Sequence, residues 1–339
     1  MLETLKALCS LEGISGNEGK VREYIISRID GKAEYSVDPL GNLIVFKKGK
    51  KASKNKVMLD AHTDEVGLII TCVTDDGLLK FDTVGGINPS VLLGRAVRVG
   101  SGEAGGVIGV KPVHLLKESE ENTLPEISDM YIDIGAADKA DALRHVSAGD
   151  IAFFDSELIE FGDSKIKARA LDDRVGCAVM IKLIESDLEY DAWFSFSSQE
   201  EVGTRGATAA AFTIAPDYAI VLETTTAADI IDVPAESRVC LLGNGPAVSF
   251  MDRSTVYDKE LFNTAFRVAA ENGIKCQPKT MVAGGNDAGA IHKSRGGVKT
   301  VTLSTPCRYL HSPSCVIDFN DAEDTLRLAG ALLTELCNA

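Results

Sequence analysis

Apolar and polar positions follow a helical period over residues 1–30. Leu2, Leu5 and Leu8 recur every three positions, which places them on one face of a first predicted helix. A second predicted helix follows a short Gly-containing turn, and Asn17 can accept backbone N–H groups at its start. Each helix therefore has one apolar face with which it can cover a sheet.

Two apolar segments, residues 42–46 and 56–62, are predicted strands. The second segment carries apolar side chains on both faces until it reaches His62. Such a run is typical of a central strand in a sheet that is covered by helices on both sides. His62 would then stand at the carboxyl end of that central strand.

The pattern changes between about residues 65 and 160, where short strand-like segments alternate with Gly-rich turns. This spacing predicts a small β-barrel or sandwich. The acidic stretch 117–122 is predicted to be an exposed loop, since a run of like charges is usually a solvated surface. The predicted strands of this block are residues 68–70, 78–81, 96–99, 106–110 and 151–154.

After residue 160, strands and helices alternate again, which predicts an α/β fold with a mixed, largely parallel sheet covered by helices. The β-rich block is then an insertion at 66–159 that splits a catalytic domain formed by 1–65 and 160–339. The elements predicted in this part are helices 173–185, 205–213, 259–272 and 320–336 and strands 192–197, 218–223 and 298–303.

Composition narrows the range of functions. The chain has 339 residues and a formal net charge of −15, which disfavours binding to nucleic-acid phosphates or to anionic membrane surfaces. No apolar run is long enough to span a bilayer, and the N-terminus does not resemble a secretory signal. The eight cysteines form no C-x-x-C pair, so we expect free thiols and a cytoplasmic protein.

Two adjacent glutamates, Glu200 and Glu201, directly follow the apolar run 192–196. Removing two like charges from water at the end of a buried strand is costly unless positive charge lies nearby. Cations are scarce in this chain, with 35 Lys and Arg against 50 Asp and Glu. Ion pairs with Arg174 or Arg205 are one solution, and bound metal ions are the other.

The candidate metal ligands fall at predicted strand ends or next to a helix start, where α/β proteins place their sites. Taken singly, a histidine there can be structural and Asp172 can be a helix cap. Two imidazoles with several carboxylates are, however, the donors that zinc, cobalt and manganese use. The count fits two ions that share one carboxylate, with Glu200 left over to handle a proton. The predicted ligands are His62, Asp172, Glu201, Glu223 and His311.

Five motifs, at residues 60–67, 171–176, 199–203, 284–289 and 309–313, resemble those of the glutamyl and tetrahedral (TET-type) aminopeptidases, which belong to a wider clan of di-metal exopeptidases. The resemblance covers essentially the whole chain. It implies an enzyme that removes N-terminal residues from peptides with two zinc or cobalt ions, manganese being a further possibility. It also implies that the insertion is a β-barrel dimerisation domain and that the chain forms homo-oligomers, from dimers up to dodecamers.

Carried over motif by motif, the resemblance implies that Asp64 orients His62, that Asp172 bridges the ions and that Glu200 is the general base. The choice of Asp172 over its neighbour Asp173 rests on analogy alone. One departure concerns Glu223, where many relatives have Asp; the longer side chain keeps the carboxylate but changes its reach. The turn 284–287 is expected to form a pocket wall or a tight turn.

Other functions remain open at this stage. A di-metal amidase or deacylase would keep every ligand and differ only in its pocket. A glycoside hydrolase would need carboxyl groups on opposite sides of the scissile bond, which adjacent glutamates do not provide. A non-catalytic metal-binding assembly subunit would have no use for Glu200. Substrate preference is also open, although four basic residues lie near the motifs: Arg253, Lys293, Arg295 and Arg308.

Overall fold

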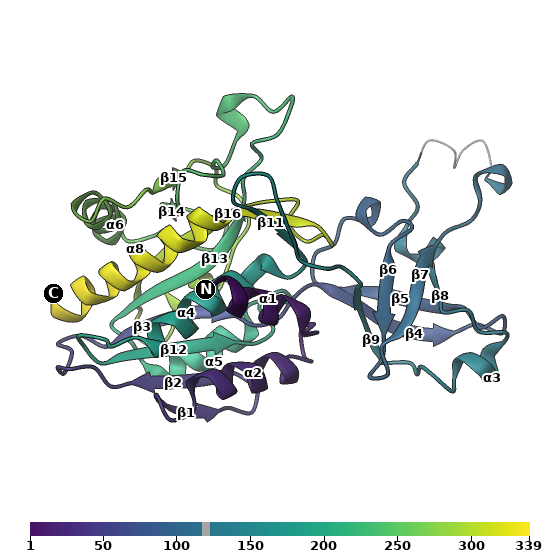
Figure 1. Cartoon of the computed structure of the whole chain (residues 1–339), viewed down its shortest axis with the longest axis horizontal. Coiled ribbons are helices and arrows are strands. Elements are labelled where there is room, and N and C mark those ends of the chain that lie inside the picture. The colour runs from purple at the N-terminus through teal and green to yellow at the C-terminus, as the bar shows by residue number, and fades with distance from the viewer. Residues whose placement is uncertain (117–122) are drawn as a thin grey trace.

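A computed structural model describes residues 1–116 and 123–339. The predicted acidic loop at 117–122 lies outside the described residues. Figure 1 shows an α/β part that holds both ends of the chain and, beside it, a β-barrel formed by the middle of the chain. In the described ranges, no helix combines the length and the apolar character needed to cross a bilayer.

An eleven-stranded sheet forms the centre of the α/β part. Nine of its strands run in the order β1-β2-β12-β3-β13-β16-β17-β11-β10, and β14 and β15 extend from β16. The strands are β1 (Glu34–Val37), β2 (Leu43–Lys47), β3 (Val57–His62), β10 (Ile159–Phe161), β11 (Lys165–Ala168), β12 (Ala192–Ser197), β13 (Tyr218–Thr226), β14 (Ala247–Ser249), β15 (Gln277–Lys279), β16 (Lys299–Arg308) and β17 (Cys315–Asp318).

The middle of this sheet is parallel and its margins are antiparallel. Strands β12, β3, β13 and β16 run side by side in the same direction, whereas β1, β2, β17, β11 and β10 pair antiparallel. The register places Ser197 opposite His62 and Val221 opposite Asp60. The carboxyl ends of β3, β12 and β13 therefore meet at one edge of the sheet, as the sequence predicts for an α/β protein.

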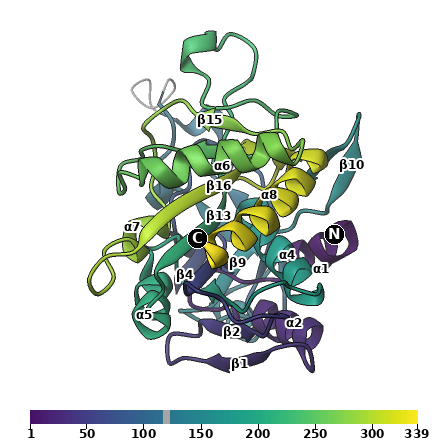
Figure 2. The ribbon, with the colours of Figure 1, turned by 90° about the vertical axis from the view of Figure 1, so that its left-hand side faces the viewer.

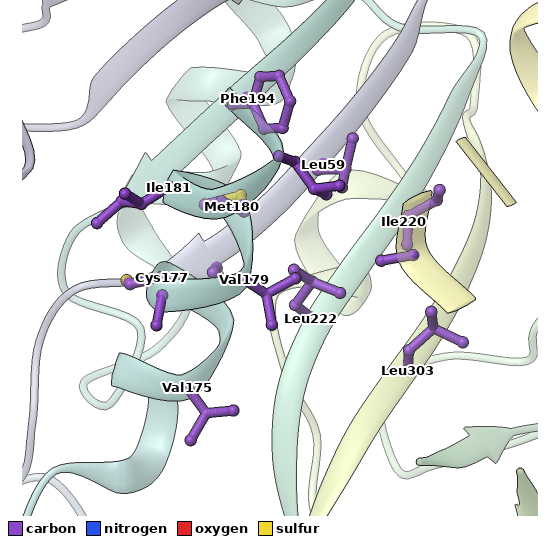
Figure 3. Close-up of a cluster of buried hydrophobic side chains, with 14 of the residues drawn as sticks. Leu59, Val175, Cys177, Val179, Met180, Ile181, Phe194, Ile220, Leu222 and Leu303 are labelled. Carbon is purple, nitrogen blue, oxygen red and sulfur yellow. The ribbon is translucent and has the colours of Figure 1, made fainter. Parts of the chain in front are cut away.

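Helices cover both faces of the sheet (Figure 2). One face packs against α1, α2, α4, α6 and α8, and the opposite face packs against α5 and α7. Figure 3 shows the first of these cores, in which Val179 of α4 lies beside Leu222 of the sheet, and Leu59 and Val175 belong to the same cluster. The helices are α1 (Leu2–Ser10), α2 (Gly19–Ile29), α3 (Lys139–Ala142), α4 (Leu171–Glu185), α5 (Arg205–Ile214), α6 (Lys259–Glu271), α7 (Ala288–Ile291) and α8 (Phe319–Asn338), with short 3-10 turns η1 (Pro89–Val91), η2 (Val113–Leu115), η3 (Ile127–Asp129) and η4 (Ala235–Ser237).

The middle of the chain forms a closed antiparallel barrel with its own apolar core, separate from that of the α/β part. Each strand predicted in this block is present, so the fold class is confirmed, with a barrel rather than a sandwich. The sequence missed one barrel strand, β8, because only its central residue is buried and no alternation is visible. In spatial order the strands are β4 (Gly67–Val73), β5 (Leu79–Val84), β8 (Tyr131–Asp133), β7 (Ala104–Gly109), β6 (Ala96–Val99) and β9 (Ile151–Phe154).

Candidate metal centre and active site

Five chain segments bring the predicted site residues together at the carboxyl edge of the parallel strands. His62 is the last residue of β3, and Glu223 lies in β13. Glu200 and Glu201 follow β12, Asp172 stands at the start of α4, and His311 lies in the loop between β16 and β17. All of them lie in one compact site. They could be predicted from the sequence because the carboxyl ends of parallel strands meet at one edge of a sheet.

Asp172 lies between the two imidazoles. Its Oδ1 is 3.3 Å from His62 Nε2, and its Oδ2 is 3.3 Å from His311 Nε2. The backbone at Asp172 and Asp173 departs from helical dihedral angles, and the peptide bond between them is cis. Asp173 lies elsewhere, because its Oδ1 accepts a hydrogen bond from Gly176 N of the same helix at 2.9 Å. Of the two aspartates, Asp172 alone contacts both histidines.

The first half-site consists of His62, Glu223 and Asp172. His62 Nε2 is 3.5 Å from Glu223 Oε1 in addition to its contact with Asp172. The other ring nitrogen, Nδ1, is 3.1 Å from the backbone oxygen of Asp64 and 3.4 Å from the Asp64 carboxylate. A proton on Nδ1 therefore has an acceptor, which leaves the lone pair of Nε2 available to a metal ion. This half-site is buried, with His62 2% exposed.

The second half-site consists of His311, Glu201 and Asp172. His311 Nε2 is 3.3 Å from Glu201 Oε2, and its Nδ1 is 2.8 Å from the backbone oxygen of Gly86. Gly86 follows β5, so the carbonyl that holds this histidine comes from the end of a barrel strand. The sequence does not predict this contact, because every residue has a backbone oxygen and no residue type marks the one that accepts a hydrogen bond.

Asp64 connects the first half-site to the paired glutamates. Its carboxylate accepts hydrogen bonds from the backbone N–H groups of Glu200 (3.0 Å) and Glu201 (3.1 Å) and from Ser15 Oγ (2.6 Å). It thus touches His62 on one side and fixes the turn after β12 on the other. Ser15 was missed from the sequence, since it belongs to the turn between α1 and α2, far along the chain.

The carboxyl groups of the site repel one another. Burial, reinforced by the charge of Asp172, raises the pKa of Glu201 to about 8 and that of Glu223 to about 8. Burial also raises the pKa of Glu200 well above its usual value, with Asp287 and Glu223 adding to the effect. A cation within this cluster would stabilise the ionised carboxylates. The sequence predicted this need for positive charge near Glu200 and Glu201.

The imidazoles are perturbed in the opposite sense. Burial lowers the pKa of His311, but Asp172 and Glu201 outweigh that effect and raise it to about 10. For His62, burial is likewise outweighed by Asp172, Asp64 and Glu223, and its pKa lies well above the ordinary value. Protons and metal ions therefore compete for the same nitrogen and oxygen atoms in this cluster.

The donor set fits two divalent ions. The ligand atoms of each half-site lie within 4.8 Å of one another, and Asp172 belongs to both groups. Asp172 Oδ1 is also buried without a hydrogen-bond donor, which is unusual for a carboxylate oxygen unless it has another partner. Two His and three carboxylates, one of them shared, match the coordination that zinc and related ions prefer.

Arginines do not neutralise the paired glutamates. Arg174 is fully buried and contacts the carboxylate of Glu65. It also donates hydrogen bonds to the backbone oxygens of Thr63 and Leu8, and so connects the end of β3 to α1. Arg205 contacts the side chain of Gln199. The ion-pair alternative considered from the sequence is therefore wrong for both arginines.

A second buried carboxyl pair lies behind the site and was not found from the sequence. Asp60 of β3 and Asp287 before α7 face each other, and Ser197 Oγ donates a hydrogen bond to Asp287 at 2.6 Å. Burial raises the pKa of Asp60 to about 6 and that of Asp287 well above its usual value. A proton on either carboxyl group would relieve the repulsion between them.

A cavity of about 450 Å³ opens onto the site, a size suited to a small ligand. Glu200 lines this cavity together with four of the predicted ligands, Asp172, Glu201, Glu223 and His311. The turn 284–286 forms one of its walls, as expected from the sequence, and Lys279 lies in the lining too. Arg253, Lys293, Arg295 and Arg308, the four basic residues considered from the sequence, do not line it.

Comparisons with known proteins agree with the motifs. A family model described as M42 glutamyl aminopeptidase matches residues 41–328. An aminopeptidase from the archaeon Desulfurococcus kamchatkensis has 34% sequence identity and a TM-score of 0.93, and the match covers 98% of this chain and 94% of that one. A lysyl aminopeptidase from Pyrococcus furiosus is 32% identical over 98% of this chain and 97% of its own length.

A further solved structure concerns assembly. It is described as a TET1 peptidase from Pyrococcus horikoshii that can assemble into a tetrahedron or a large octahedral shell. Its sequence identity is 37% and its TM-score 0.87, with 99% of both chains covered. The family match over most of the chain, together with full-length relatives above 30% identity, confirms the resemblance drawn from the motifs: the chain belongs to the M42 glutamyl aminopeptidase family and is an aminopeptidase.

Proposed function

We propose that this chain removes N-terminal residues from peptides with a water molecule activated between two divalent metal ions. The observation that carries the proposal is the position of Asp172, which contacts two histidines that each have a further carboxylate of their own. One ion would be held by His62, Glu223 and Asp172, and the other by His311, Glu201 and Asp172. Zinc or cobalt suits these donors, with manganese as a third option.

When bound, such ions polarise the scissile carbonyl and lower the pKa of water. Glu200 would accept the proton of the attacking water at its carboxylate and pass it to the leaving amine. Its side chain lines the cavity but belongs to neither ligand group. Its raised pKa suits a group that must take up a proton and later release it.

Asp64 would act as a positioning residue. It orients His62 and at the same time fixes the backbone of Glu200 and Glu201. The base and the first half-site are thereby held by the same carboxylate. The longer side chain of Glu223, compared with Asp in many relatives, still reaches to 3.5 Å from His62 Nε2.

The different roles proposed for the paired glutamates, Glu200 as base and Glu201 as ligand, can be tested directly. We expect Glu200→Gln to lower kcat by at least about 10³-fold while metal content stays at that of the wild type. Glu201→Gln should instead reduce the metal bound per subunit, measured by atomic emission on the purified protein. Wild-type turnover by Glu200→Gln would overturn the assignment of the base.

A di-metal amidase or deacylase is the closest rival, because it would use the same ligands. Aminoacyl p-nitroanilides and their N-acetylated counterparts, assayed with zinc, cobalt and manganese, separate the two. Cleavage of the free-amine substrates supports the aminopeptidase, and cleavage of the blocked substrates alone would support the deacylase. The adjacent positions of Glu200 and Glu201 on one turn disfavour a glycoside hydrolase.

The proposed assembly is a homo-oligomer, and peptides are the proposed partners. The barrel at 66–159, with domain boundaries as predicted from the sequence, is the proposed dimerisation domain. Support for assembly comes from the Pyrococcus horikoshii relative, which is described as forming closed shells. The eight free cysteines are consistent with the proposed cytoplasmic location.

A further inference from the structure

The turn that carries Glu200 is held by side chains from three other segments of the chain. The four consecutive backbone N–H groups of residues 198–201 each donate a hydrogen bond to a side-chain oxygen, at 2.9 to 3.1 Å. The acceptors, in order along the turn, are Asn42, Glu18 and, for the last two groups, Asp64. The backbone that bears the proposed base is therefore fixed from outside its own segment.

This turn needs such support because its backbone conformation is unusual. Gln199, immediately before the proposed base, has a φ of 56°, in the left-handed region that residues other than Gly rarely adopt. A conformation of this kind persists only where the surrounding structure holds it. After Glu200 the turn is closed locally, because Gly203 N and Thr204 N donate to the Glu200 backbone oxygen. The N–H groups at the start of the turn rely instead on the side-chain acceptors.

Glu18 occupies the N-cap position of α2 but does not cap that helix. Its side chain accepts no hydrogen bond from the first turn of α2. Its Oε1 accepts instead from Gly16 N at 2.7 Å and from Gln199 N at 3.1 Å. Glu18 is 4% exposed, and burying a carboxylate is costly unless its interactions offset that cost. Helix capping therefore does not explain this residue, whereas the contact with the turn after β12 does.

Glu18 belongs to the connection between α1 and α2, which contacts the ends of both strands next to the site. Glu65 N donates to Gly13 O at 2.9 Å, and Ser15 Oγ donates to the Asp64 carboxylate at 2.6 Å. These contacts attach the connection to the segment that follows β3, and Glu18 attaches it to the segment that follows β12. One connection thus fixes the position of the proposed base relative to the first half-site.

We propose that Glu18 is a positioning residue, whose carboxylate fixes the backbone of Gln199 and thereby the place at which Glu200 enters the cavity. This inference rests on the proposed function, in which Glu200 is the general base. Glu18 does not itself line the cavity, so it acts on the reaction through the backbone. A general base must lie within hydrogen-bond reach of the proton that it accepts, and a displacement of about 1 Å can lower the rate by about 100-fold.

Two substitutions separate the hydrogen bond from the rest of the side chain. Glu18→Gln keeps an oxygen that can accept from Gln199 N, whereas Glu18→Met has a similar size but no such oxygen. With each enzyme loaded with metal, we expect Glu18→Met to lower kcat by about 10- to 100-fold and to change KM by less than about twofold. Glu18→Gln should retain most of the wild-type kcat, and both variants should bind as much metal per subunit as the wild type.

An equal loss of kcat in Glu18→Gln and Glu18→Met would overturn the proposal, because the acceptor oxygen would then not be what matters. A loss of activity that is fully accounted for by unfolded or metal-depleted protein would overturn it too. Thermal unfolding and metal analysis on the assayed preparations measure these two fractions.

Amide hydrogen exchange tests the effect on the turn without turnover. In the metal-free protein, residues 197–204 should exchange faster in Glu18→Met than in the wild type, since Gln199 N loses its acceptor. Glu18→Gln should exchange at nearly the wild-type rate. Mass spectrometry of the peptides from this segment measures the difference, and unchanged exchange in Glu18→Met would contradict the proposed support.

A double-mutant cycle tests whether Glu18 acts through Glu200. If it does, Glu18→Met should have little further effect on the residual turnover of Glu200→Gln, because the base is already absent. The same fold loss in both backgrounds would show that Glu18 acts elsewhere and would overturn this inference alone. Wild-type turnover by Glu200→Gln would overturn the proposed function and this inference with it.

The matched control is Glu23, an exposed glutamate of the same helix. Glu23→Met and Glu23→Gln should leave kcat, metal content and amide exchange at their wild-type values. If Glu18→Met fails to fold, Glu18→Asp replaces it, because Asp keeps the charge, suits an N-cap position and withdraws the oxygen by about one carbon–carbon bond. Glu18→Asp should then show the loss of kcat, and wild-type kcat in this variant would overturn the proposal.

Discussion

The two candidate half-sites contain the same donors but are built differently. His62 belongs to a central strand and is 2% exposed, whereas the side chain of His311 is 31% exposed and sits on a loop with a φ of 55°. His62 is fixed through residues of its own domain, and His311 through a carbonyl that follows a barrel strand. Because the same candidate donors are held with different rigidity in the two half-sites, two ions bound there should differ in affinity and in exchange rate.

The largest effect is expected for the carboxylate that both half-sites share. Asp172→Asn removes the charge from both groups, so both ions should be lost and activity should fall by at least about 10³-fold. Metal content and kcat/KM are measured on the same preparation. Asp187→Asn, a change at an exposed aspartate after α4, is the matched control. Retention of both ions by Asp172→Asn would contradict the shared role.

Chelation tests whether the two half-sites release their ions at different rates. We predict two phases of metal release when the loaded wild-type enzyme is mixed with a chelator, because the exposed loop site opens more readily than the strand site. His311→Asn should eliminate the fast phase, and His62→Asn the slow phase. Release is followed with a chromogenic metal indicator. A single phase in the wild type would show that the two supports are equivalent.

The pH dependence of metal binding is the next effect in size. Glu201 and Glu223 have pKa values of about 8 and His311 of about 10, so in the metal-free protein at pH 7 these groups carry protons that an ion must displace. Metal affinity should therefore rise with pH and level off only near pH 10. Calorimetry in buffers of different ionisation enthalpy measures the protons released.

Single variants sharpen this measurement. Glu201→Gln and Glu223→Gln should each reduce the number of protons released, since an amide has none to give up. A proton count that is independent of both residues would contradict the view that they are ligands.

The smallest effect concerns the fold rather than the site. Glu185 accepts hydrogen bonds from Arg28 at 2.6 Å and Lys182 at 2.7 Å, and its pKa is lowered to about 2, with burial opposing the effect of these two partners. A lowered pKa contributes stability above the unfolded value near 4.5 that is lost as pH falls toward 2. Because solvent screens the pairs, Glu185→Gln should cost about 1 kcal/mol at pH 7 and less at pH 3.

Denaturant unfolding at the two pH values measures this cost, with the exposed Glu323→Gln as the control that should show none. The effect of acid on this ion pair thus lies below pH 5, separate from the range near pH 8 to 10 in which Glu201, Glu223 and His311 titrate. An equal cost at both pH values would show that Glu185 stabilises the fold by something other than its charge.

The sequence could predict the long, buried strands and the residues at their ends. β3 and β12 can be recognised because each is a nearly continuous apolar run, and His62, Glu200 and Glu201 follow from the rule that parallel strands end at one edge. Asp172 and His311 also lie in the site, although their roles as ligands remain predictions.

Short strands with little burial could not be predicted in the same way. All residues of β1 and β10 are exposed, and β14 and β15 have three residues each. Lys279 was missed for this reason: only the pairing of β15 with β14 places it beside the cavity. Ser15 and Gly86 were missed because their contacts depend on the chain's three-dimensional path.

The contact between Gly86 and His311 has a consequence for the inserted domain. One hydrogen bond makes the orientation of a ligand depend on where the barrel rests against the rest of the molecule. A neighbouring subunit pressing on the barrel would thus act on one of the predicted ligands through the Gly86 carbonyl. A chain without residues 66–159 would keep all its predicted ligands but would lose the hydrogen bond with Gly86 that orients His311.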